Sequence, residues 1–382
     1  MALVAEGKRS LVEAAGVLGV SYRQTKRIYR RYREEGASGL VHRNVGKPSH
    51  RRIEESVRRA ILEAYREHYE GFGPTLAAEK LAERNGLEVD HETLRRWLLA
   101  EGLWKSRRQR RTYRSRRERR RRFGELVQFD GSHHAWFEER GEKCCLMNMV
   151  DDATGTTYSF LAEQETTEAA LRLLWAWIEH YGIPQAVYCD RKNAYVLDRE
   201  PTIEEQLQGV TPKSPFEVAC EKLGIEVIVA HSPQAKGRVE RNHGVYQDRF
   251  VKELRLQGIS EIEEANVFLK TRYLDSINEK FAKPPVDPLD AHVPLLSGQS
   301  LANTLCFTHP RVVSHDYVIL FQRGLYQIQR QKRRRLPTPG TQVMVHRWLD
   351  GSLHFFTKGG KELLVEELQE RPKKEAPTAL SA

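Results

Sequence analysis

Three acidic residues in this chain of 382 residues lie where they could act on one substrate. Asp130 ends the apolar run ELVQF, Asp190 ends the apolar run PQAVYC, and Glu240 lies one turn into a helix-like segment. Three carboxylates at one sheet edge would repel one another, and hard divalent cations such as Mg²⁺ or Mn²⁺ remove that conflict. Two such ions about 3.5–4 Å apart can support an in-line phosphoryl displacement. The three acids therefore predict a two-metal phosphoryl-transfer site.

The segments between residues 125 and 255 must bring these acids together. In chain order they read as three strands, a helix, a strand, a helix, a strand and a helix, at 125–132, 143–155, 156–163, 167–181, 184–190, 215–223, 225–230 and 235–255. Gly155 makes a turn, so the first three strands form an antiparallel meander. In such a mixed α/β layer, we expect the later strands to run parallel to the first. The strand ends that carry Asp130 and Asp190 then lie together if the two strands are neighbours.

The last of these helices carries a polar stripe beside an apolar one. Residues of the polar stripe are spaced by four, three and four positions, which places them on one helix face: Lys236, Glu240, His243 and Gln247. The apolar stripe, which would pack on the sheet, contains Val239, Tyr246 and Phe250. We expect Glu240 to stand at the edge of the core and to face the two aspartates. Lys236, Arg238 and Arg241 would reach DNA phosphates; the alternative for Lys236 is a free surface amine.

The net charge of +10 is concentrated in one segment. Residues 105–122 hold twelve basic residues and one acid, and residues 1–50 hold ten basic residues and four acids. A solvated linker can have this composition, but a dense arginine run between two domains is better explained by contact with a phosphate backbone. The arginines assigned to that contact are Arg107, Arg108, Arg110 and Arg111. Double-stranded DNA is therefore the predicted partner.

Two segments have the pattern of helix-turn-helix units. Residues 9–35 read as two helices separated by Gly19, with Ser21 as the N-cap of the second, and residues 91–103 read as the last helix of another unit. The second helix of such a unit enters the major groove. The residues expected to contact DNA are Arg23, Gln24, Arg27, Thr93, Arg95 and Arg96. For residues 9–35 the alternative is a small helical hairpin with a solvated basic face.

The region after residue 260 is expected to be less regular. Residues 261–283 read as helical, a Pro-rich linker follows, and short alternating segments from Phe307 predict a small β-barrel. The expected boundaries are 1–48 and 49–104 for the two helix-turn-helix domains, 105–123 for the Arg-rich connector, 124–260 for the catalytic domain, 261–300 for a linker, 301–370 for the small β domain and 371–382 for a disordered tail.

Composition excludes some other classes of protein. The chain has no run of about 18 apolar residues, so a membrane span is not expected. Its five cysteines include no CxxC pair, which argues against a disulfide framework or a cysteine zinc site and fits a reducing cytoplasm.

The sequence motifs around the three acids resemble those of a known family. QFDGS around Asp130, DDAT at 151–154, VYCDRKNAY around Asp190 and SPQAKGRVERNHGVYQDR around Glu240 resemble the catalytic domain of DDE transposases and retroviral-type integrases. The helical N-terminal region and the small β domain are similar to those of bacterial insertion-sequence transposases of the ISNCY group, so the resemblance covers nearly the whole chain.

This resemblance implies a multidomain fold and a DNA transposase. The fold would comprise an all-α tandem helix-turn-helix region, an α/β ribonuclease-H-like core and a small β-barrel. The enzyme would bind terminal inverted repeats, hydrolyse the 3′ ends and join them to target DNA with two Mg²⁺ ions, for which Mn²⁺ can substitute. The resemblance also implies at least a dimer in the DNA complex. It further implies a cytoplasmic bacterial protein that associates with the nucleoid.

Two rivals remain: an inactive transposase-derived DNA-binding regulator, and a structure-specific nuclease of the same fold. The chain also departs from the retroviral-type pattern, because an insertion at 194–213 lengthens the connection between Asp190 and Glu240. Four further acids lie in that expected loop, with no strand to fix them: Asp198, Glu200, Glu204 and Glu205. His133 and His134, after Asp130, read as part of an ordinary loop; the alternative is a contact with DNA or a supporting role behind the metal ligands.

Overall fold

The computed structural model describes residues 1–42, 45–46, 53–105, 117–192, 194–197, 199–207, 209, 211–230, 236–296, 298–331 and 335–369. Contacts divide the chain into two compact units. The first contains Met1–Glu70 and Ala77–Leu98, and the second contains Gly71–Leu76 and Leu99–Ala382. The finer division into seven segments stays a prediction.

The N-terminal helices follow the sequence pattern closely. They are α1 (Ala2–Ala5), α2 (Leu11–Leu18), α3 (Tyr22–Glu35) and the 3-10 helix Gly36–Leu40. Gly19 ends α2 in the left-handed region at a φ of 62°, which favours glycine. The Ser21 hydroxyl then accepts a hydrogen bond from the Gln24 amide and so caps α3. The break between two helices and the cap of the second are therefore confirmed.

Three more helices form the second helical group: α4 (Glu55–His68), α5 (Pro74–Asn85) and α6 (His91–Ala100). Their helical spacing buries a small apolar core that includes Ile61, Tyr65, Leu81, Leu94 and Leu98. The Asp90 carboxylate caps the N-terminus of α6 by accepting hydrogen bonds from the amides of Glu92 and Thr93.

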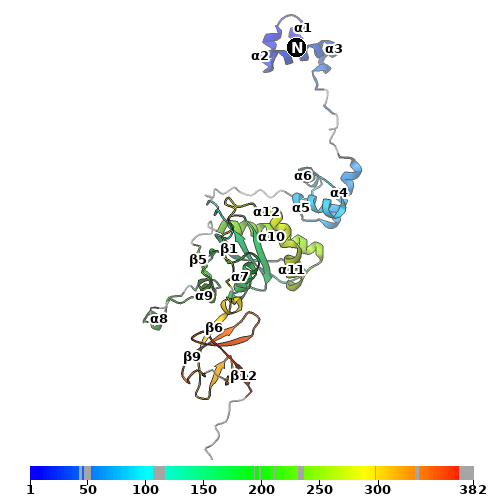
Figure 1. Cartoon of the computed structure of the whole chain (residues 1–382). Coiled ribbons are helices and arrows are strands. Elements are labelled where there is room, and N and C mark those ends of the chain that lie inside the picture. Colours follow the sequence, from blue (N-terminus) through cyan, green and yellow to red (C-terminus); the bar gives the residue numbers. More distant parts are fainter. Residues whose placement is uncertain are drawn as a thin grey trace, which may run out of the picture. The chain divides into compact units, whose positions relative to one another are not determined.

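A five-stranded sheet forms the centre of the second unit (Figure 1). Its strands are β1 (Val127–His134), β2 (Cys144–Asp151), β3 (Thr157–Ala162), β4 (Ala186–Cys189) and β5 (Glu226–Val229), in the order β3-β2-β1-β4-β5. The first three strands pair antiparallel, whereas β4 lies parallel to β1 and β5 parallel to β4. The meander and the parallel direction of the later strands are therefore confirmed, and the structure shows in addition that β1 and β4 are neighbours. Asp130 lies in the middle of β1 and not at its end, where it was predicted, because the strand continues to His134.

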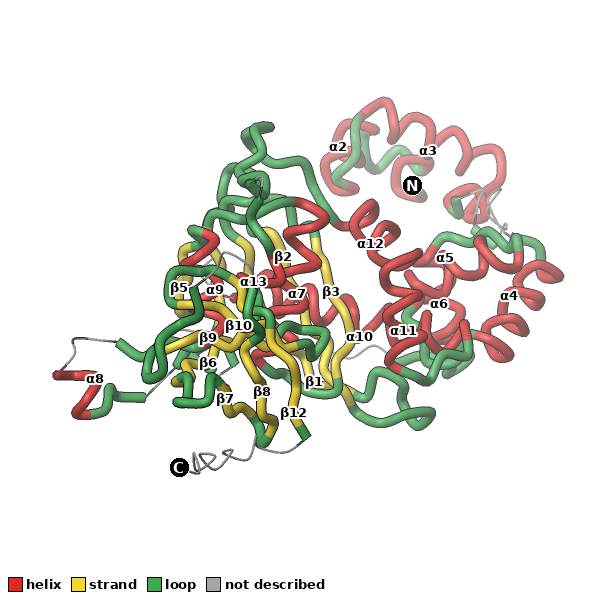
Figure 2. The backbone as a smooth tube through the Cα atoms, turned by 60° about the horizontal axis from the view of Figure 1, so that its bottom comes forward, coloured by secondary structure: helices red, strands yellow, loops and turns green. Residues whose placement is uncertain are grey.

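Helices cover both faces of this sheet (Figures 1 and 2). They are α7 (Thr167–Tyr181) and α9 (Pro215–Leu223) on one face, and α10 (Gly237–Gln257), α11 (Ile262–Phe268), the π-helix Leu269–Tyr273 and α12 (Leu274–Phe281) on the other. Successive side chains of a strand point to opposite faces. Strand β1 therefore presents Val127 and Phe129 to the core under α7 and α9, and Gln128, Asp130 and Ser132 to α10.

The C-terminal strands correct one prediction. They are β6 (Phe307–Val312), β7 (Val318–Phe321), β8 (Gly324–Ile328), β9 (Gln342–Arg347), β10 (Leu353–Thr357), β11 (Glu362–Leu363) and β12 (Val365–Leu368), preceded by α13 (Leu301–Thr304). They form two open sheets, β11-β10-β9-β6 and β12-β8-β7, and not the closed barrel expected. Phe321 and Ile328 of one sheet share a core with Val345 and Phe355 of the other. Facing sheets bury the alternating apolar residues without closure.

Two smaller points complete the fold. The insertion expected as a loop at 194–213 contains a short helix, α8 (Ile203–Leu207). In the part of the chain that the structure describes, no helix combines the length and apolar composition that crossing a bilayer requires.

Candidate active site

Strand β1 carries a polar row on the face that α10 covers. The Gln128 side-chain oxygen accepts a hydrogen bond of 3.1 Å from the Val239 amide, and the Ser132 hydroxyl accepts one of 3.2 Å from the Gln247 side chain. Asp130 lies between them, with its side chain 15% exposed. The alternation of the strand thus directs three polar side chains toward one helix, where a purely structural contact would be apolar.

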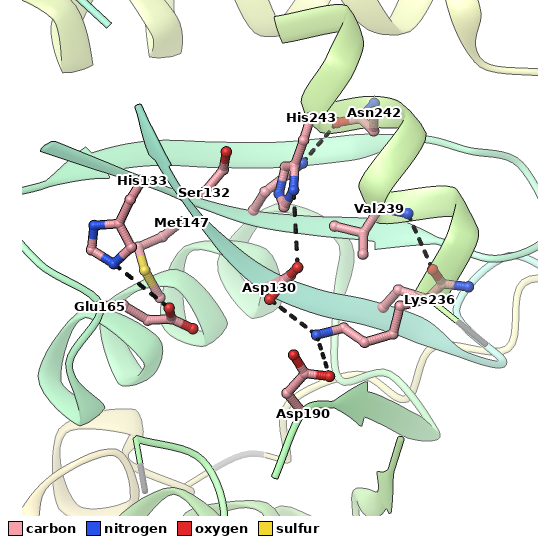
Figure 3. A network of polar contacts seen from close by, with 12 residues as sticks. Asp130, Ser132, His133, Met147, Glu165, Asp190, Lys236, Val239, Asn242 and His243 are labelled. Atoms are coloured by element: carbon pink, nitrogen blue, oxygen red, sulfur yellow. Dashed lines mark hydrogen bonds and ion pairs between the residues drawn. The ribbon is translucent and has the colours of Figure 1, made fainter. Parts of the chain in front are cut away.

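Lys236 joins Asp130 to Asp190 (Figure 3). Its Nζ lies 3.0 Å from Oδ1 of Asp130 and 2.9 Å from Oδ1 of Asp190, and its side chain is only 3% exposed. It is therefore neither a free surface amine nor, in this structure, a group directed at a phosphate. The parallel pairing of β1 and β4 brings the two aspartates together, and their shared negative charge holds the ammonium there.

Hydrogen bonding at this cluster is incomplete. Among the described residues, Asp130 Oδ1, Lys236 Nζ and His243 Nε2 are buried without a hydrogen-bond partner, although the first two form an ion pair. Burial lowers the pKa of His243 to about 4, so its imidazole is neutral at pH 7 and its 3.9 Å approach to Asp130 Oδ2 is not an ion pair. Buried polar atoms that lack partners are a feature of sites that bind ligands.

Glu240 lies in the first turn of α10 and its side chain is exposed. Lys236, four residues before it, and His243, three residues after it, both contact Asp130. Residues at these spacings share one face of a helix. This spacing predicts that Glu240 lies on the same side of α10 as Lys236 and His243, but Glu240 is exposed whereas those two side chains are buried. Among the described residues, the ligand atoms that gather within 4.8 Å of one another belong to His133, Cys145 and Glu165, and not to the three acids. The place of Glu240 in the site therefore stays a prediction.

A second set of contacts was not predicted from the sequence. The Glu165 carboxylate, whose side chain is 7% exposed, accepts hydrogen bonds of 2.5 Å from the Tyr195 hydroxyl and 2.8 Å from Lys192. Lys192 Nζ also lies 3.8 Å from Asp130 Oδ1. The one local signal is Gly131, where a Cβ would lie 2.7 Å from the Glu165 carboxyl carbon. The prediction of a loop at His133 and His134 is wrong, because both residues lie in β1, where His133 Nε2 is 3.9 Å from the Glu165 carboxylate.

The arginines near Glu240 differ from each other. Arg238 Nε donates a hydrogen bond of 2.6 Å to the buried carboxylate of Asp152, and its side chain is 17% exposed. Arg238 was predicted to contact a DNA phosphate, but in the structure it is held by Asp152 instead. Arg241 is exposed and accessible to such a contact.

The other residues that were predicted to bind DNA lie either on α3 and α6 or outside the residues that the structure describes. Arg23, Gln24 and Arg27 are exposed on α3, and Arg96 is exposed on α6. Arg95 donates two hydrogen bonds, of 2.6 and 2.7 Å, to Glu92 of its own helix, and Thr93 is half-buried. The connector arginines lie outside the described residues: Arg107, Arg108, Arg110 and Arg111.

The N-terminal region matches two families of homeodomain-like domains, one over residues 1–41 and the other over residues 24–98. Among solved structures, the chain is similar to a chain of the simian T-cell lymphotropic virus intasome, with 17% identity, a TM-score of 0.35 and coverage of 76% of this chain and 97% of that one. The HTLV-2 integrase catalytic core domain, solved with magnesium, matches with 17% identity and a TM-score of 0.31, over 48% of this chain and 97% of that one.

Two curated proteins are similar to nearly the whole chain. The transposase for insertion sequence IS1202 of Streptococcus pneumoniae is 27% identical over 98% of this chain and 87% of its own length. A putative transposase of Sinorhizobium fredii, y4bF, is 40% identical over 93% of this chain and 77% of its own length. Membership of the ISNCY group stays a prediction. Because the chain is 40% identical to a putative transposase over 93% of its own length and 77% of that protein's length, it belongs to the transposase family.

Proposed function

We propose that this DNA transposase cleaves the 3′ ends of a transposon and joins them to target DNA at a site formed by Asp130, Asp190 and Glu240. One observation carries the proposal: Asp130 and Asp190 share a buried cation, Lys236 Nζ, under the helix that carries Glu240. A place in the protein that stabilises positive charge between two carboxylates suits a reaction at a phosphodiester.

The donor atoms fit a divalent cation. Asp130 Oδ1 is buried, and its one close cation among the described residues is the Lys236 ammonium, 3.0 Å away, with no hydrogen bond to complete its coordination. Carboxylate oxygens are the ligands that Mg²⁺ and Mn²⁺ prefer, and such an ion would take the place of the ammonium. Asp130, Asp190 and Glu240 would hold two such ions, which supply the positive charge that an in-line displacement at phosphorus needs on its entering and leaving oxygens.

The chain would supply the rest by holding DNA. The exposed residues of α3 and α6, with the connector arginines, would bind the terminal repeats as double-stranded DNA. In the first step, water attacks a phosphorus and the bond to the 3′ oxygen of the transposon end breaks. In the second, that 3′ hydroxyl attacks a target phosphodiester and a target 3′ oxygen leaves. Joining two ends requires at least two copies of the chain in the complex.

A strand-transfer assay with the full chain tests the proposal. The end sequence is first found by selecting random duplexes that the full chain binds, and a labelled, pre-cut end is then incubated with target DNA and Mg²⁺. The active enzyme gives labelled products longer than either input. Glu240→Gln should lower their yield about a thousandfold or more, whereas Glu205→Gln, which removes an acid paired with Arg199, should not.

Three outcomes contradict the proposal. Cleavage without joined products indicates a structure-specific nuclease. Binding of ends without cleavage or joining indicates a DNA-binding regulator. Full activity of Glu240→Gln shows that another acid completes the site.

A further inference from the structure

Asp152, the residue after β2, is a fully buried acid outside the proposed metal site. Its carboxylate accepts hydrogen bonds of 2.9 Å from the Gln128 side chain, 2.6 Å from Arg238 Nε and 2.8 Å from the backbone amide of Arg120. Arg117 also pairs with it. Three separate parts of the chain therefore meet at this acid: strand β1, helix α10 and the end of the basic connector.

Two of these contacts lead to the residues directly before Glu240. Arg238 bonds to Asp152 itself, and the Val239 amide donates to the Gln128 side chain that Asp152 orients. The first amides of a helix have no partner within the helix. The residue before α10, Lys236, provides no side-chain cap. Gln128 supplies the missing acceptor, and Asp152 fixes which end of the Gln128 amide faces the helix.

The connector meets the same acid from the other side. The Arg120 amide and the Arg117 guanidinium bond to Asp152, and Arg119 Nη1 donates a hydrogen bond of 2.9 Å to the carbonyl of Ala153. These arginines end the basic run at 105–122. Asp152 thus ties the final residues of the connector to the first turn of α10.

The charge of Asp152 is retained despite its burial. Burial raises the pKa of this carboxyl, but the hydrogen bonds from the Arg120 amide and the Arg238 guanidinium outweigh that effect and lower the pKa below its ordinary value. A buried carboxylate with this many fixed donors has one orientation, because rotation would leave a donor unpaired.

We propose that Asp152 is a positioning residue that holds the first turn of α10 so that Glu240 reaches the metal site. This inference rests on the proposed role of Glu240. Asp152 would act on Glu240 through Arg238 and Gln128, which it contacts directly. The loss of residues that orient metal ligands commonly weakens metal binding about 10–100-fold.

Asp151 is the matched control, since it is adjacent in sequence and equally buried. Its carboxylate accepts hydrogen bonds of 3.0 Å from the Gly124 amide, 2.7 Å from the Thr154 amide and 2.8 Å from the Thr154 hydroxyl. None of these three donors belongs to α10. Asp151→Asn should therefore disturb the fold around β2 without moving Glu240.

The experiment measures Mn²⁺ binding to the full chain by electron paramagnetic resonance, in which free Mn²⁺ gives the signal. Asp152→Asn should raise the Mn²⁺ dissociation constant about tenfold, and Asp151→Asn should change it less than about twofold. Arg238→Gln should reproduce the effect of Asp152→Asn, and the double variant should bind no worse than either single variant, because both remove one linkage. Arg238→Lys, which keeps the charge, should recover part of the affinity.

If Asp152→Asn does not fold, Arg238→Gln tests the positioning role by itself. The Arg238 side chain is partly exposed, so this variant is expected to fold. Affinities of Asp152→Asn and Arg238→Gln equal to that of the unmodified chain overturn the positioning role and leave the proposed function intact. Mn²⁺ binding that does not depend on Asp130, judged with Asp130→Asn, overturns the metal site itself and this inference with it.

Discussion

Two pairs of carboxylates in the same sheet have opposite surroundings. Asp151 and Asp152 are fully buried, and backbone amides, a hydroxyl and arginines on fixed elements donate to them. Asp130 and Asp190 share one lysine ammonium, and Asp130 Oδ1, which faces that ammonium, accepts no hydrogen bond from the described residues.

The difference separates acids that stabilise the protein from acids that bind a ligand. A buried carboxylate with all its donors in place rigidifies the elements that meet at it, whereas an incompletely bonded one keeps its binding capacity for another group. Substitutions at either pair of carboxylates test this difference.

The largest expected effect is on catalysis by the incompletely bonded pair. Asp130→Asn should lower the rate of strand cleavage about a thousandfold or more, because it removes a negative ligand of the metal site. Its melting temperature should fall less than that of Asp151→Asn, since Asp130 makes few fixed hydrogen bonds. Cleavage kinetics with end DNA and thermal melting of the same preparations test both points. A cleavage rate within tenfold of the unmodified enzyme contradicts the assignment.

Removing the shared cation should destabilise the protein in a way that metal reverses. Lys236→Met leaves two carboxylates facing each other, and in the absence of divalent ions the free energy of unfolding should fall by about 2–3 kcal/mol, since Asp190 is partly exposed. Mg²⁺ or Mn²⁺ should restore most of the lost melting temperature.

Lys252→Met is the control for that variant. Lys252 lies on α10, the helix that Lys236 precedes, and pairs with Asp248, outside the site. Its melting temperature should respond to Mg²⁺ as that of the unmodified chain does. A Lys236→Met variant that Mg²⁺ does not stabilise more than this control argues against a metal between the two aspartates.

Asp151→Asn should lower stability whether or not metal is present. An asparagine turns one acceptor oxygen into an NH₂ group that faces the amide of Gly124 or the donors of Thr154, which costs about 1–3 kcal/mol. Urea unfolding with and without Mg²⁺ measures this loss. Recovery by Mg²⁺ would mean that the two pairs are not separate.

The smallest expected effect is on the pH dependence of stability. The folded-state pKa of Asp152 is lowered, so the stability it contributes is present above its unfolded pKa, about 3.9, and is lost as the pH falls through the folded value. Burial raises the pKa of Asp151 more than its hydrogen bonds lower it, so its ionisation costs stability that is recovered as the pH falls. Between pH 3 and 6, the unfolding free energy should depend less steeply on pH in Asp152→Asn, and more steeply in Asp151→Asn, than in the unmodified chain.

Much of the local structure could be predicted from the sequence. The helix α7 spans the predicted 167–181, and Gly19 and Ser21 mark the end of α2 and the start of α3 as expected. These features depend on helical periodicity, caps and glycine conformations within a few residues, which short stretches of sequence contain in full.

The surroundings of the acids could be predicted only in part. Spacing placed Lys236 and Glu240 on one helix face, but whether the lysine points to solvent or to an aspartate depends on what lies opposite that face. Glu165 and Lys192 meet from two distant loops, and Arg238 meets Asp152 across the sheet. No local pattern encodes such pairs. The same limit explains why the predicted barrel was wrong, because closure of a barrel depends on pairing between the first and last strands of the region.

The sequence by itself determined most of the elements, the antiparallel meander of the first three strands and the three candidate acids. The strand order that makes β1 and β4 neighbours, and the position of Asp130 in the middle of β1, came from the tertiary structure. Only the tertiary structure decided that Lys236 lies between Asp130 and Asp190, that Asp152 holds the start of α10, and that the C-terminal strands form two sheets. The reason is physical. Local elements follow from backbone geometry and short-range contacts, whereas ion pairs and sheet edges depend on charges and strands that meet only after the chain has folded.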